Sequence, residues 1–238
     1  MNVKTWDSSF KVPVKGLFFG NLNASMTVPE CAKNRAALMD ILAPDQGLLL
    51  STPFQWHSKD AILIDTPWLK PEEGDALVTD KPNVPIGILT ADCAPVLFSG
   101  VKADGTPVIG AAHAGARGAA RGIISSTVRL MREQGAEAIQ AALGPCIHPQ
   151  SYEVGTDFQD EMIAEDHGSY KFFKANGNDK FQFDLPSYVK HLLDREQVPY
   201  HFIDVDTYAS GECFSYRRAT HRGEADYGRE LSAIVILP

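Results

Sequence analysis

Apolar residues gather in short runs separated by Gly, Pro or Asp, a pattern typical of β-strands. Segments with apolar residues every three or four positions are fewer and indicate helices. Strands outnumber helices and do not alternate strictly with them, so we expect an α+β fold of mixed β-sheets layered with helices. The predicted strands are Gly47–Ser51, Ala61–Ile64, Ala76–Thr79, Ile86–Thr90, Pro107–Ala112, Ala138–Leu143, Tyr200–Val205 and Ala233–Leu237, and the predicted helices are Pro29–Leu42, Ala119–Glu133, Gly155–Ala164 and Leu185–Glu196.

Length and charge narrow the class of protein. The 238 residues contain no repeat and no long polar linker, so we expect a single domain over residues 1–238. The net charge of −8 argues against a sequence-independent nucleic-acid binder, which needs surplus cations to displace counterions from phosphates. No apolar run approaches the roughly 20 residues of a membrane span, and the first residues lack the apolar core of a signal peptide. We therefore expect a cytoplasmic protein without a membrane segment.

The segment Phe54–His57 is the first candidate for chemistry. If the chain is extended here, side chains alternate between faces, and Gln55 and His57 share one face. A lone histidine is a weak sign of a site, because many histidines are simply hydrogen-bonded structural residues.

The apolar run Ile86–Phe98 is interrupted by Thr-Ala-Asp-Cys at residues 90–93. The interruption predicts a bend that aims Asp92 or Cys93 at a ligand. A buried structural role is the commonest fate of a free cysteine. An unpaired carboxylate inside an apolar run is costly, however, which favours a functional role for this segment.

The predicted strand Pro107–Ala112 leads through His113 and a glycine-rich turn into a predicted helix. Gly115 and Gly118 allow a ligand to approach the backbone closely. The unpaired N–H groups of the helix start, together with Arg117 and Arg121, suit an anion such as phosphate. The GxxxxGK[ST] pattern of a P-loop is absent. The same small residues would also permit close packing of helix on sheet, so both interpretations stay open.

His57, Cys93 and His113 each follow a strand-like run, where functional sites are usually built. Two imidazoles and one thiolate suit Zn²⁺, and three protein ligands leave a fourth position open. The three residues follow no local spacing rule, so the residues alone leave the triad a hypothesis. The cluster Phe214–Arg218 contains adjacent arginines that can bind an anion, although such arginines are usually just solvated. Cys146 is expected to be structural.

Nine motifs in this order resemble those of the YfiH, or laccase-domain, family, whose members have been called polyphenol oxidases and purine nucleoside phosphorylases. They span nearly the whole chain, so a chance resemblance is improbable. The motifs lie at Lys33–Arg35, Gln55–His57, Gly74–Asp80, Thr90–Val96, His113–Gly118, Gly144–Ile147, Tyr152–Val154, Phe183–Leu185 and Phe214–Arg218.

The resemblance implies a mixed-sheet fold similar to bacterial cytotoxic deamidase domains, and a zinc site formed by His57, Cys93 and His113. It also implies phosphorolysis of adenosine, inosine, guanosine and methylthioadenosine, and deamination of adenosine. Ala116 stands where the family usually has Trp, which predicts a wider pocket or the loss of a stacking surface. Asp206-Thr207 stands where a Cys-Thr pair is common, so Cys213 is not assumed to be equivalent.

These expectations assign roles to individual residues. A water on the metal would ionise near neutral pH and attack an electron-poor ring carbon. Arg117, the helix start and Arg217 would hold inorganic phosphate, and Gln55 and Asn23 are candidates for fixing the purine. Asp92 is the nominee for acid–base work beside Cys93 and His113, which requires a sharp turn, because alternation along an extended chain would point it away from Cys93.

Other functions remain open at this stage. Cys93 and His113 could form a metal-free hydrolase, and the family also implies hydrolytic editing of a peptidoglycan precursor. A copper-dependent polyphenol oxidase is disfavoured, because a multicopper site needs many histidines and the chain has only seven. A non-catalytic nucleotide-binding module would bind purines without product. The chain could act as a monomer or a dimer.

Overall fold

The computed structural model describes residues 1–238 except 1–2, 12, 25–30 and 69. Within this part of the chain the strands form a four-stranded sheet β1-β2-β13-β5, a six-stranded sheet β12-β8-β6-β7-β4-β3 and a three-stranded sheet β10-β11-β9. The pairs β3–β4 and β8–β12 are parallel and the others are antiparallel. The strands are β1 (Lys4–Asp7), β2 (Val14–Gly20), β3 (Ala61–Leu63), β4 (Ala76–Thr79), β5 (Ile86–Thr90), β6 (Ala94–Val101), β7 (Pro107–Ala114), β8 (Glu137–Leu143), β9 (Glu153–Gly155), β10 (Phe173–Ala175), β11 (Lys180–Phe183), β12 (Tyr200–Phe202) and β13 (Glu230–Ile236).

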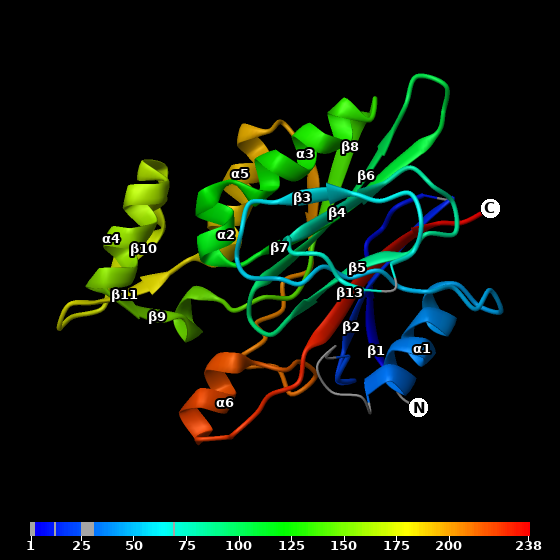
Figure 1. Cartoon of the computed structure of the whole chain (residues 1–238). Coiled ribbons are helices and arrows are strands. Elements are labelled where there is room, and N and C mark those ends of the chain that lie inside the picture. Colours follow the sequence, from blue (N-terminus) through cyan, green and yellow to red (C-terminus); the bar gives the residue numbers. More distant parts are fainter. Residues whose placement is uncertain (1–2, 12, 25–30, 69) are drawn as a thin grey trace.

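Helices cover the outer faces of the two larger sheets (Figure 1). The helices α2, α3 and α5 lie against the six-stranded sheet, and α1 lies against the four-stranded sheet. The helices are α1 (Cys31–Leu42), α2 (Ala116–Arg121), α3 (Ile123–Glu133), α4 (Thr156–Glu165), α5 (Leu185–Arg195) and α6 (Tyr216–Arg222), with 3₁₀ turns η1 (Pro149–Ser151) and η2 (His167–Phe172).

Alternation along the strands produces this layering. On β7, Ala112 packs into the core beneath the helices, whereas Ile109 and Ala111 pack into the core between the two sheets. On β2, Phe18 faces the other sheet and Phe19 faces α1. These two strands are therefore buried on both faces, and the layers run helices, six-stranded sheet, four-stranded sheet, helix.

The three-stranded sheet and α4 lie to one side of these layers, at the left of Figure 1. Aromatic rings hold this segment together: the Phe173 and Phe183 centroids are 4.5 Å apart, and Phe158 of α4 lies 5.9 Å from Phe183. The segment stands beside α2 and α6, which positions it as a wall of the candidate site.

The α+β expectation is confirmed, and two predicted strands, Ala76–Thr79 and Ile86–Thr90, match β4 and β5 residue for residue. The strand predicted at Gly47–Ser51 is wrong, because only an isolated bridge from Ser51 to Ile86 forms there. The helix predicted at Ala119–Glu133 is two helices, because Gly122 adopts a left-handed φ of 104° between α2 and α3.

The sequence pattern also failed to predict several short elements. The pattern missed β1, β2, β9, β10, β11 and α6, several of which are only three or four residues long. Of the helix predicted at Pro29–Leu42, residues 29–30 lie outside the described residues, and α1 begins at Cys31. Among the helices that the structure describes, none is long and apolar enough to cross a membrane. The likeness to cytotoxic deamidase domains stays a prediction.

Candidate metal centre

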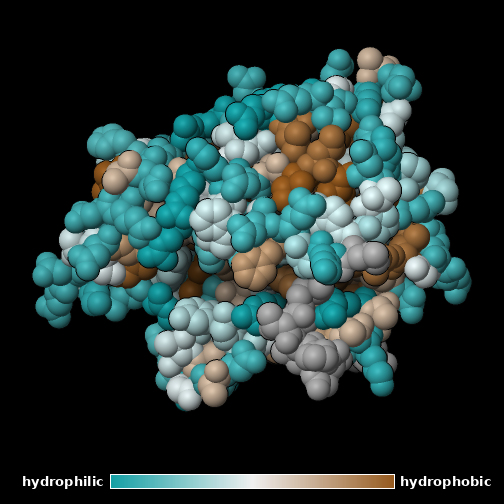
Figure 2. Space-filling view, in the orientation of Figure 1, coloured by the Kyte–Doolittle hydropathy of each residue, from teal (hydrophilic) through white to brown (hydrophobic). Residues whose placement is uncertain are grey.

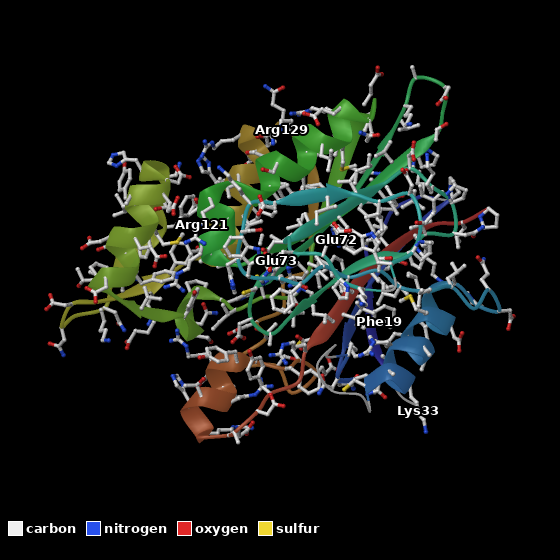
Figure 3. The ribbon with its side chains drawn as sticks, in the orientation of Figure 1. Phe19, Lys33, Glu72, Glu73, Arg121 and Arg129 are labelled. Atoms are coloured by element: carbon white, nitrogen blue, oxygen red, sulfur yellow. The ribbon has the colours of Figure 1, made fainter. Side chains whose placement is uncertain are left out.

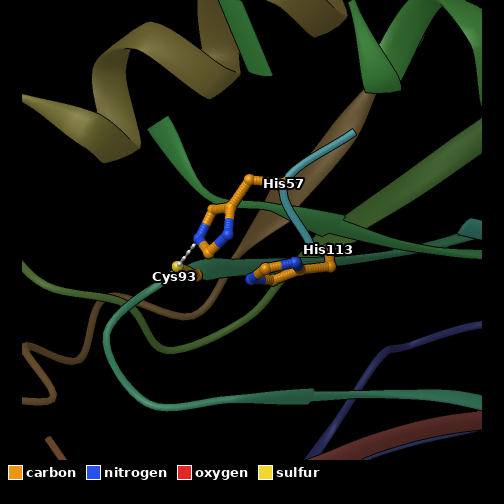
Figure 4. Close-up of side chains that lie close together, drawn as sticks. All are labelled: His57, Cys93 and His113. Atoms are coloured by element: carbon orange, nitrogen blue, oxygen red, sulfur yellow. Dashed lines mark hydrogen bonds between the residues drawn. The ribbon is translucent and has the colours of Figure 1, made fainter. Parts of the chain in front are cut away.

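His57, Cys93 and His113 converge although they are far apart in the sequence (Figure 4). One ligand atom from each lies within 4.8 Å of the others, and the Cys93 Sγ is 3.6 Å from the His57 Nε2. Strand pairing explains part of this convergence. The antiparallel register of β6 and β7 places Pro95 opposite His113. Cys93, two residues before Pro95, therefore lies beside the end of β7.

The turn that the acid–base role of Asp92 required is present. Asp92 adopts a left-handed φ of 88° between β5 and β6, which breaks the alternation of side chains. Its buried carboxylate accepts one hydrogen bond from the Thr207 Oγ1 and one from the Arg217 backbone N–H, both at 2.7 Å. Asp92 therefore ties the turn before Cys93 to the first turn of α6.

The segment Phe54–His57 is not an extended strand, so the predicted sharing of one face by Gln55 and His57 is wrong. The backbone N–H groups of residues 56, 57 and 58 all donate to the Asp75 carboxylate, at 3.3, 3.1 and 2.6 Å. Successive N–H groups that point at one anion curl the chain, and His57 accordingly has a left-handed φ of 65°. The Gln55 side chain is bonded at both ends to the Leu89 backbone, at 2.7 and 2.8 Å.

Asp75 also fixes the second histidine. Its fully buried carboxylate accepts a hydrogen bond from the His113 Nδ1 at 2.7 Å, which leaves the His113 Nε2 as the atom available to a metal. The sequence reasoning assigned no role to Asp75. A carboxylate directly before the buried strand Ala76–Thr79 is the signal that could have drawn attention to it.

The charges of the site are coupled. Burial opposes ionisation of the Cys93 thiol, but the charge of His113 and the hydrogen bonds of both histidines outweigh it and lower the pKa of Cys93. Burial also opposes protonation of His113, but Cys93 and Asp75 outweigh it and raise the pKa of His113. For Asp75, burial is outweighed by hydrogen bonds from His113 and Ser58, so its pKa is lowered. The site thus favours a thiolate, which is the form of cysteine that binds metals.

The separation of the Cys93 and His57 donors fits a tetrahedral metal ion. With Zn–S near 2.3 Å and Zn–N near 2.0 Å, tetrahedral ligands place sulfur and nitrogen about 3.5 Å apart, close to the 3.6 Å between Cys93 and His57. Gly115 packs directly against the donors: a Cβ there would lie 2.6 Å from the His57 Cδ2 and 2.9 Å from the Cys93 Sγ. Throughout the described residues, these three side chains are the one group of His, Cys, Asp or Glu that could hold a metal.

The donors form part of the wall of a cavity of about 850 Å³. In Figure 2 the surface is indented between the α6 segment and the three-stranded sheet. Other lining residues come from the segment before β3, the β5–β6 turn, α2, β9, α4, β11 and α6 with the chain that follows it. Among them are Phe54, Gln55, Asp92, Ala116, Arg117, Tyr152, Phe158, Lys180, Tyr216, Arg217, Tyr227 and Arg229.

Three arginines that line the cavity lie over aromatic rings, one of them Arg229 over Tyr227 and the other two Arg117 and Arg217. The Arg117 guanidinium lies 5.4 Å from the Phe158 ring centre, and its Nε donates to both Glu161 carboxylate oxygens at 2.8 and 3.0 Å. The Arg217 guanidinium lies 5.3 Å from the Tyr152 ring centre, and its NH1 donates to the Glu153 carbonyl at 2.6 Å. These contacts hold two cations at the cavity in defined positions.

The remaining candidates lie elsewhere. Asn23 is not among the cavity-lining residues; its Oδ1 accepts a hydrogen bond from the Arg229 backbone N–H, and Arg229 does line the cavity. Arg121, labelled in Figure 3, lies between α2 and α4, where it donates to the His57 carbonyl at 3.0 Å and pairs with Glu165. Arg218 donates to four backbone carbonyls and supports the loop before α6.

Comparison with known proteins agrees with the motifs. The chain matches, over residues 16–237, a family described as multi-copper polyphenol oxidoreductase laccase. It is 31% identical over 217 residues to a protein of Rickettsia prowazekii named purine nucleoside phosphorylase, covering 90% of this chain and 88% of that protein. It is 35% identical over 166 residues to Escherichia coli purine nucleoside phosphorylase YfiH, covering 69% of this chain and 66% of that protein.

Solved structures point the same way. A Neisseria meningitidis protein of the DUF152 family superposes with a TM-score of 0.79 at 28% identity, covering 100% of both chains. The YfiH protein of Bacillus licheniformis superposes with a TM-score of 0.79 at 25% identity, covering 94% of this chain and 92% of that one. The fold, the converging His-Cys-His group and the full-length matches together show that the chain belongs to the laccase-domain family.

Proposed function

We propose that the chain is a zinc-dependent purine nucleoside phosphorylase, acting as one domain on inosine, adenosine, guanosine or methylthioadenosine. The observation that supports it is the placement of a three-donor metal group and two stacked arginines on one cavity. A phosphorylase binds a neutral nucleoside and a small anion, inorganic phosphate, in one cavity. The arginines supply the positive charge that the phosphate needs. Relatives that match most of the chain carry the name purine nucleoside phosphorylase.

In this proposal His57, Cys93 and His113 would hold the zinc ion. When bound, zinc supplies Lewis acidity to an oxygen atom in the open fourth position. Asp75 orients His113 through its Nδ1 and shapes the His57 loop through backbone N–H groups. The protein's own contribution is therefore a preformed donor set, which requires little rearrangement on metal binding.

Arg117 and Arg217 are the proposed phosphate holders. An arginine suits phosphate because its planar donors match two phosphate oxygens at once. Stacking on Phe158 and Tyr152 fixes the two guanidinium groups and lowers the entropy lost on binding. The helix start that the sequence suggested as a third contributor belongs to α2, which has only six residues, so we assign the phosphate to the arginines.

Phosphorolysis breaks the bond between ribose C1′ and the purine nitrogen. A phosphate oxygen forms a new bond to C1′ and gives up its proton, the bonding electron pair leaves with the base, and the base takes up that proton. Asp92 is the proposed carrier of that proton, because it lines the cavity next to Cys93. Each Asp92 oxygen accepts one hydrogen bond and keeps a second lone pair for this purpose. Gln55 contributes by bracing the cavity wall against β5.

The test uses the zinc-loaded protein with inosine and inorganic phosphate. We expect hypoxanthine and ribose 1-phosphate in equal amounts, and no hypoxanthine without phosphate. The variant Arg117→Gln should raise the KM for phosphate about tenfold or more while zinc content stays unchanged. Arg129→Gln is the matched control, because Arg129 is an exposed surface residue on α3 (Figure 3). Failure of every purine nucleoside to react would overturn the proposal, and inosine formed from adenosine would reveal deamination instead.

A metal-free thiol hydrolase is the second candidate. It is favoured by the position of the Cys93 thiol, which lies 3.6 Å from the His57 Nε2 and beside His113, the arrangement of an activated nucleophile. This function predicts turnover that survives complete removal of zinc. Elemental analysis of the purified protein, which also reports copper, separates the two candidates.

A further inference from the structure

Tyr216 and Tyr227 form a pair of aromatic rings on the wall of the cavity. Both residues line the cavity, and their ring centres are 5.1 Å apart at an angle of 66°. The Arg229 guanidinium lies 4.3 Å from the centre of the Tyr227 ring. The open aromatic surface is therefore mainly that of Tyr216, whose side chain is 53% exposed.

The position of this pair is tied to the metal centre. Tyr216 opens α6 and precedes Arg217, whose backbone N–H donates to the Asp92 carboxylate at 2.7 Å. Asp92 in turn precedes the metal ligand Cys93. An exposed tyrosine would ordinarily be free to move with its segment, but here a short buried chain of contacts connects it to the donor group.

The first turn of α6 thus presents two different groups to the cavity. The Arg217 side chain runs toward Tyr152 and the Glu153 carbonyl, whereas the Tyr216 ring packs on Tyr227. Both tyrosines and Arg217 line the cavity. A cationic surface beside an open aromatic surface suits a ligand with an anionic end and a flat ring.

We infer that the Tyr216–Tyr227 pair is the binding platform for the purine base, with the Tyr216 ring as the stacking face. The inference rests on the proposed function, since it names the part of the site that holds the base. Stacking on tyrosine is insensitive to the substituents on the ring, so one platform accepts adenine, hypoxanthine and guanine alike. A bicyclic purine covers more of the ring than a pyrimidine does, so the platform also selects for purines.

Steady-state kinetics of the zinc-loaded protein test the platform. Tyr216→Ala should raise the KM for inosine about tenfold, within the range measured for base–aromatic stacking, and leave kcat and the KM for phosphate within about twofold. Tyr216→Phe should behave like the unmodified protein, because it keeps the ring. Tyr170→Ala is the matched control, since Tyr170 is 57% exposed on η2 and does not line the cavity. A Tyr216→Phe variant as impaired as Tyr216→Ala would overturn the stacking role.

Calorimetry with free hypoxanthine tests the stacking platform separately from the proposed phosphorylase function. We expect Tyr216→Ala to bind hypoxanthine about tenfold more weakly than the unmodified protein, with equal zinc content. Hypoxanthine binding that depends on Tyr216, without phosphorolysis, would support the platform and overturn the proposed function. Phosphorolysis with an unchanged inosine KM in Tyr216→Ala would overturn the platform alone. No binding of any purine base by the unmodified protein would overturn the platform as well.

Discussion

The Asp75 carboxylate binds both histidines of the candidate metal centre: it accepts the His113 Nδ1 hydrogen at 2.7 Å and the His57 backbone N–H at 3.1 Å. One fully buried side chain thus sets the ring orientation of one ligand and the loop conformation of the other. Carboxylates in this position make an imidazole a better ligand and fix which nitrogen faces the metal.

Removing this carboxylate should weaken the metal site. Asp75→Asn keeps the shape of the side chain but supplies only one oxygen acceptor for four donors. We expect zinc affinity to fall about 10- to 100-fold, measured by competition with a chelator of known affinity. Asp80→Asn is the control, because Asp80 pairs with Lys102 and Lys81 away from the donors. Equal zinc affinity in both variants would contradict the positioning role of Asp75.

Adding one methyl group at Gly115 should also destroy the site. A Cβ there would lie 2.6 Å from the His57 Cδ2 and 2.9 Å from the Cys93 Sγ, closer than such atoms approach. Because the Cys93 and His57 side chains must move away from the new methyl group, Gly115→Ala should bind less than about a tenth of the zinc of the unmodified protein. Gly211→Ala, with no atom within 4 Å of the new Cβ, should bind zinc normally. Full zinc occupancy in Gly115→Ala would show that the donors do not need this close packing.

Metal removal should expose one reactive cysteine. Burial raises the pKa of Cys93, but the charge of His113 and the hydrogen bonds of both histidines outweigh burial and lower it. Burial raises the pKa of Cys146 and Cys213. After chelation of zinc, iodoacetamide should modify Cys93 first, and added zinc should protect it. Peptide mass spectrometry identifies the modified residue. Modification of Cys93 at the same rate with and without zinc would support the metal-free hydrolase.

Glu230 makes the stability of the fold sensitive to pH. The residue is 5% exposed on β13; its Oε1 accepts the Phe214 N–H, and no partner of its Oε2 lies in the described part of the chain. Burial, and the nearby charge of Asp92, raise the pKa of Glu230 well above its ordinary value of 4.5, although Phe214 and Arg218 oppose the rise. The folded protein therefore keeps a proton that the unfolded chain releases above pH 4.5.

The sign of the effect follows from proton linkage. The contribution of Glu230 to stability is complete below its unfolded pKa and is lost as pH rises toward the folded pKa. Glu230→Gln removes the titrating group and should raise the Tm at pH 8 by about 2 °C or more, with a much smaller change near pH 4.5. The exposed Glu212, changed to Gln, is the control. Thermal melts at pH 8 and near pH 4.5 measure the change in Tm, and equal changes in Tm at the two pH values would contradict the prediction.

The sequence by itself determined the class of fold and predicted which side chains are candidates for the chemistry. Apolar periodicity located β4, β5, α5 and most of α3, because a buried strand or an amphipathic helix leaves its pattern in consecutive residues. The family resemblance carried by the motifs predicted His57, Cys93 and His113 as a donor group, and the structure brings these three side chains together.

Tertiary structure decided how those residues meet. Asp75 curls the His57 segment that periodicity described as extended, and Gly122 divides a helix that periodicity described as continuous. Tyr216 and Tyr227 share a cavity wall with the donors, and a hydrogen bond ties the first turn of α6 to Asp92. Contacts between residues far apart in the chain depend on strand register and on buried hydrogen bonds, and neither leaves a periodic signal in the sequence.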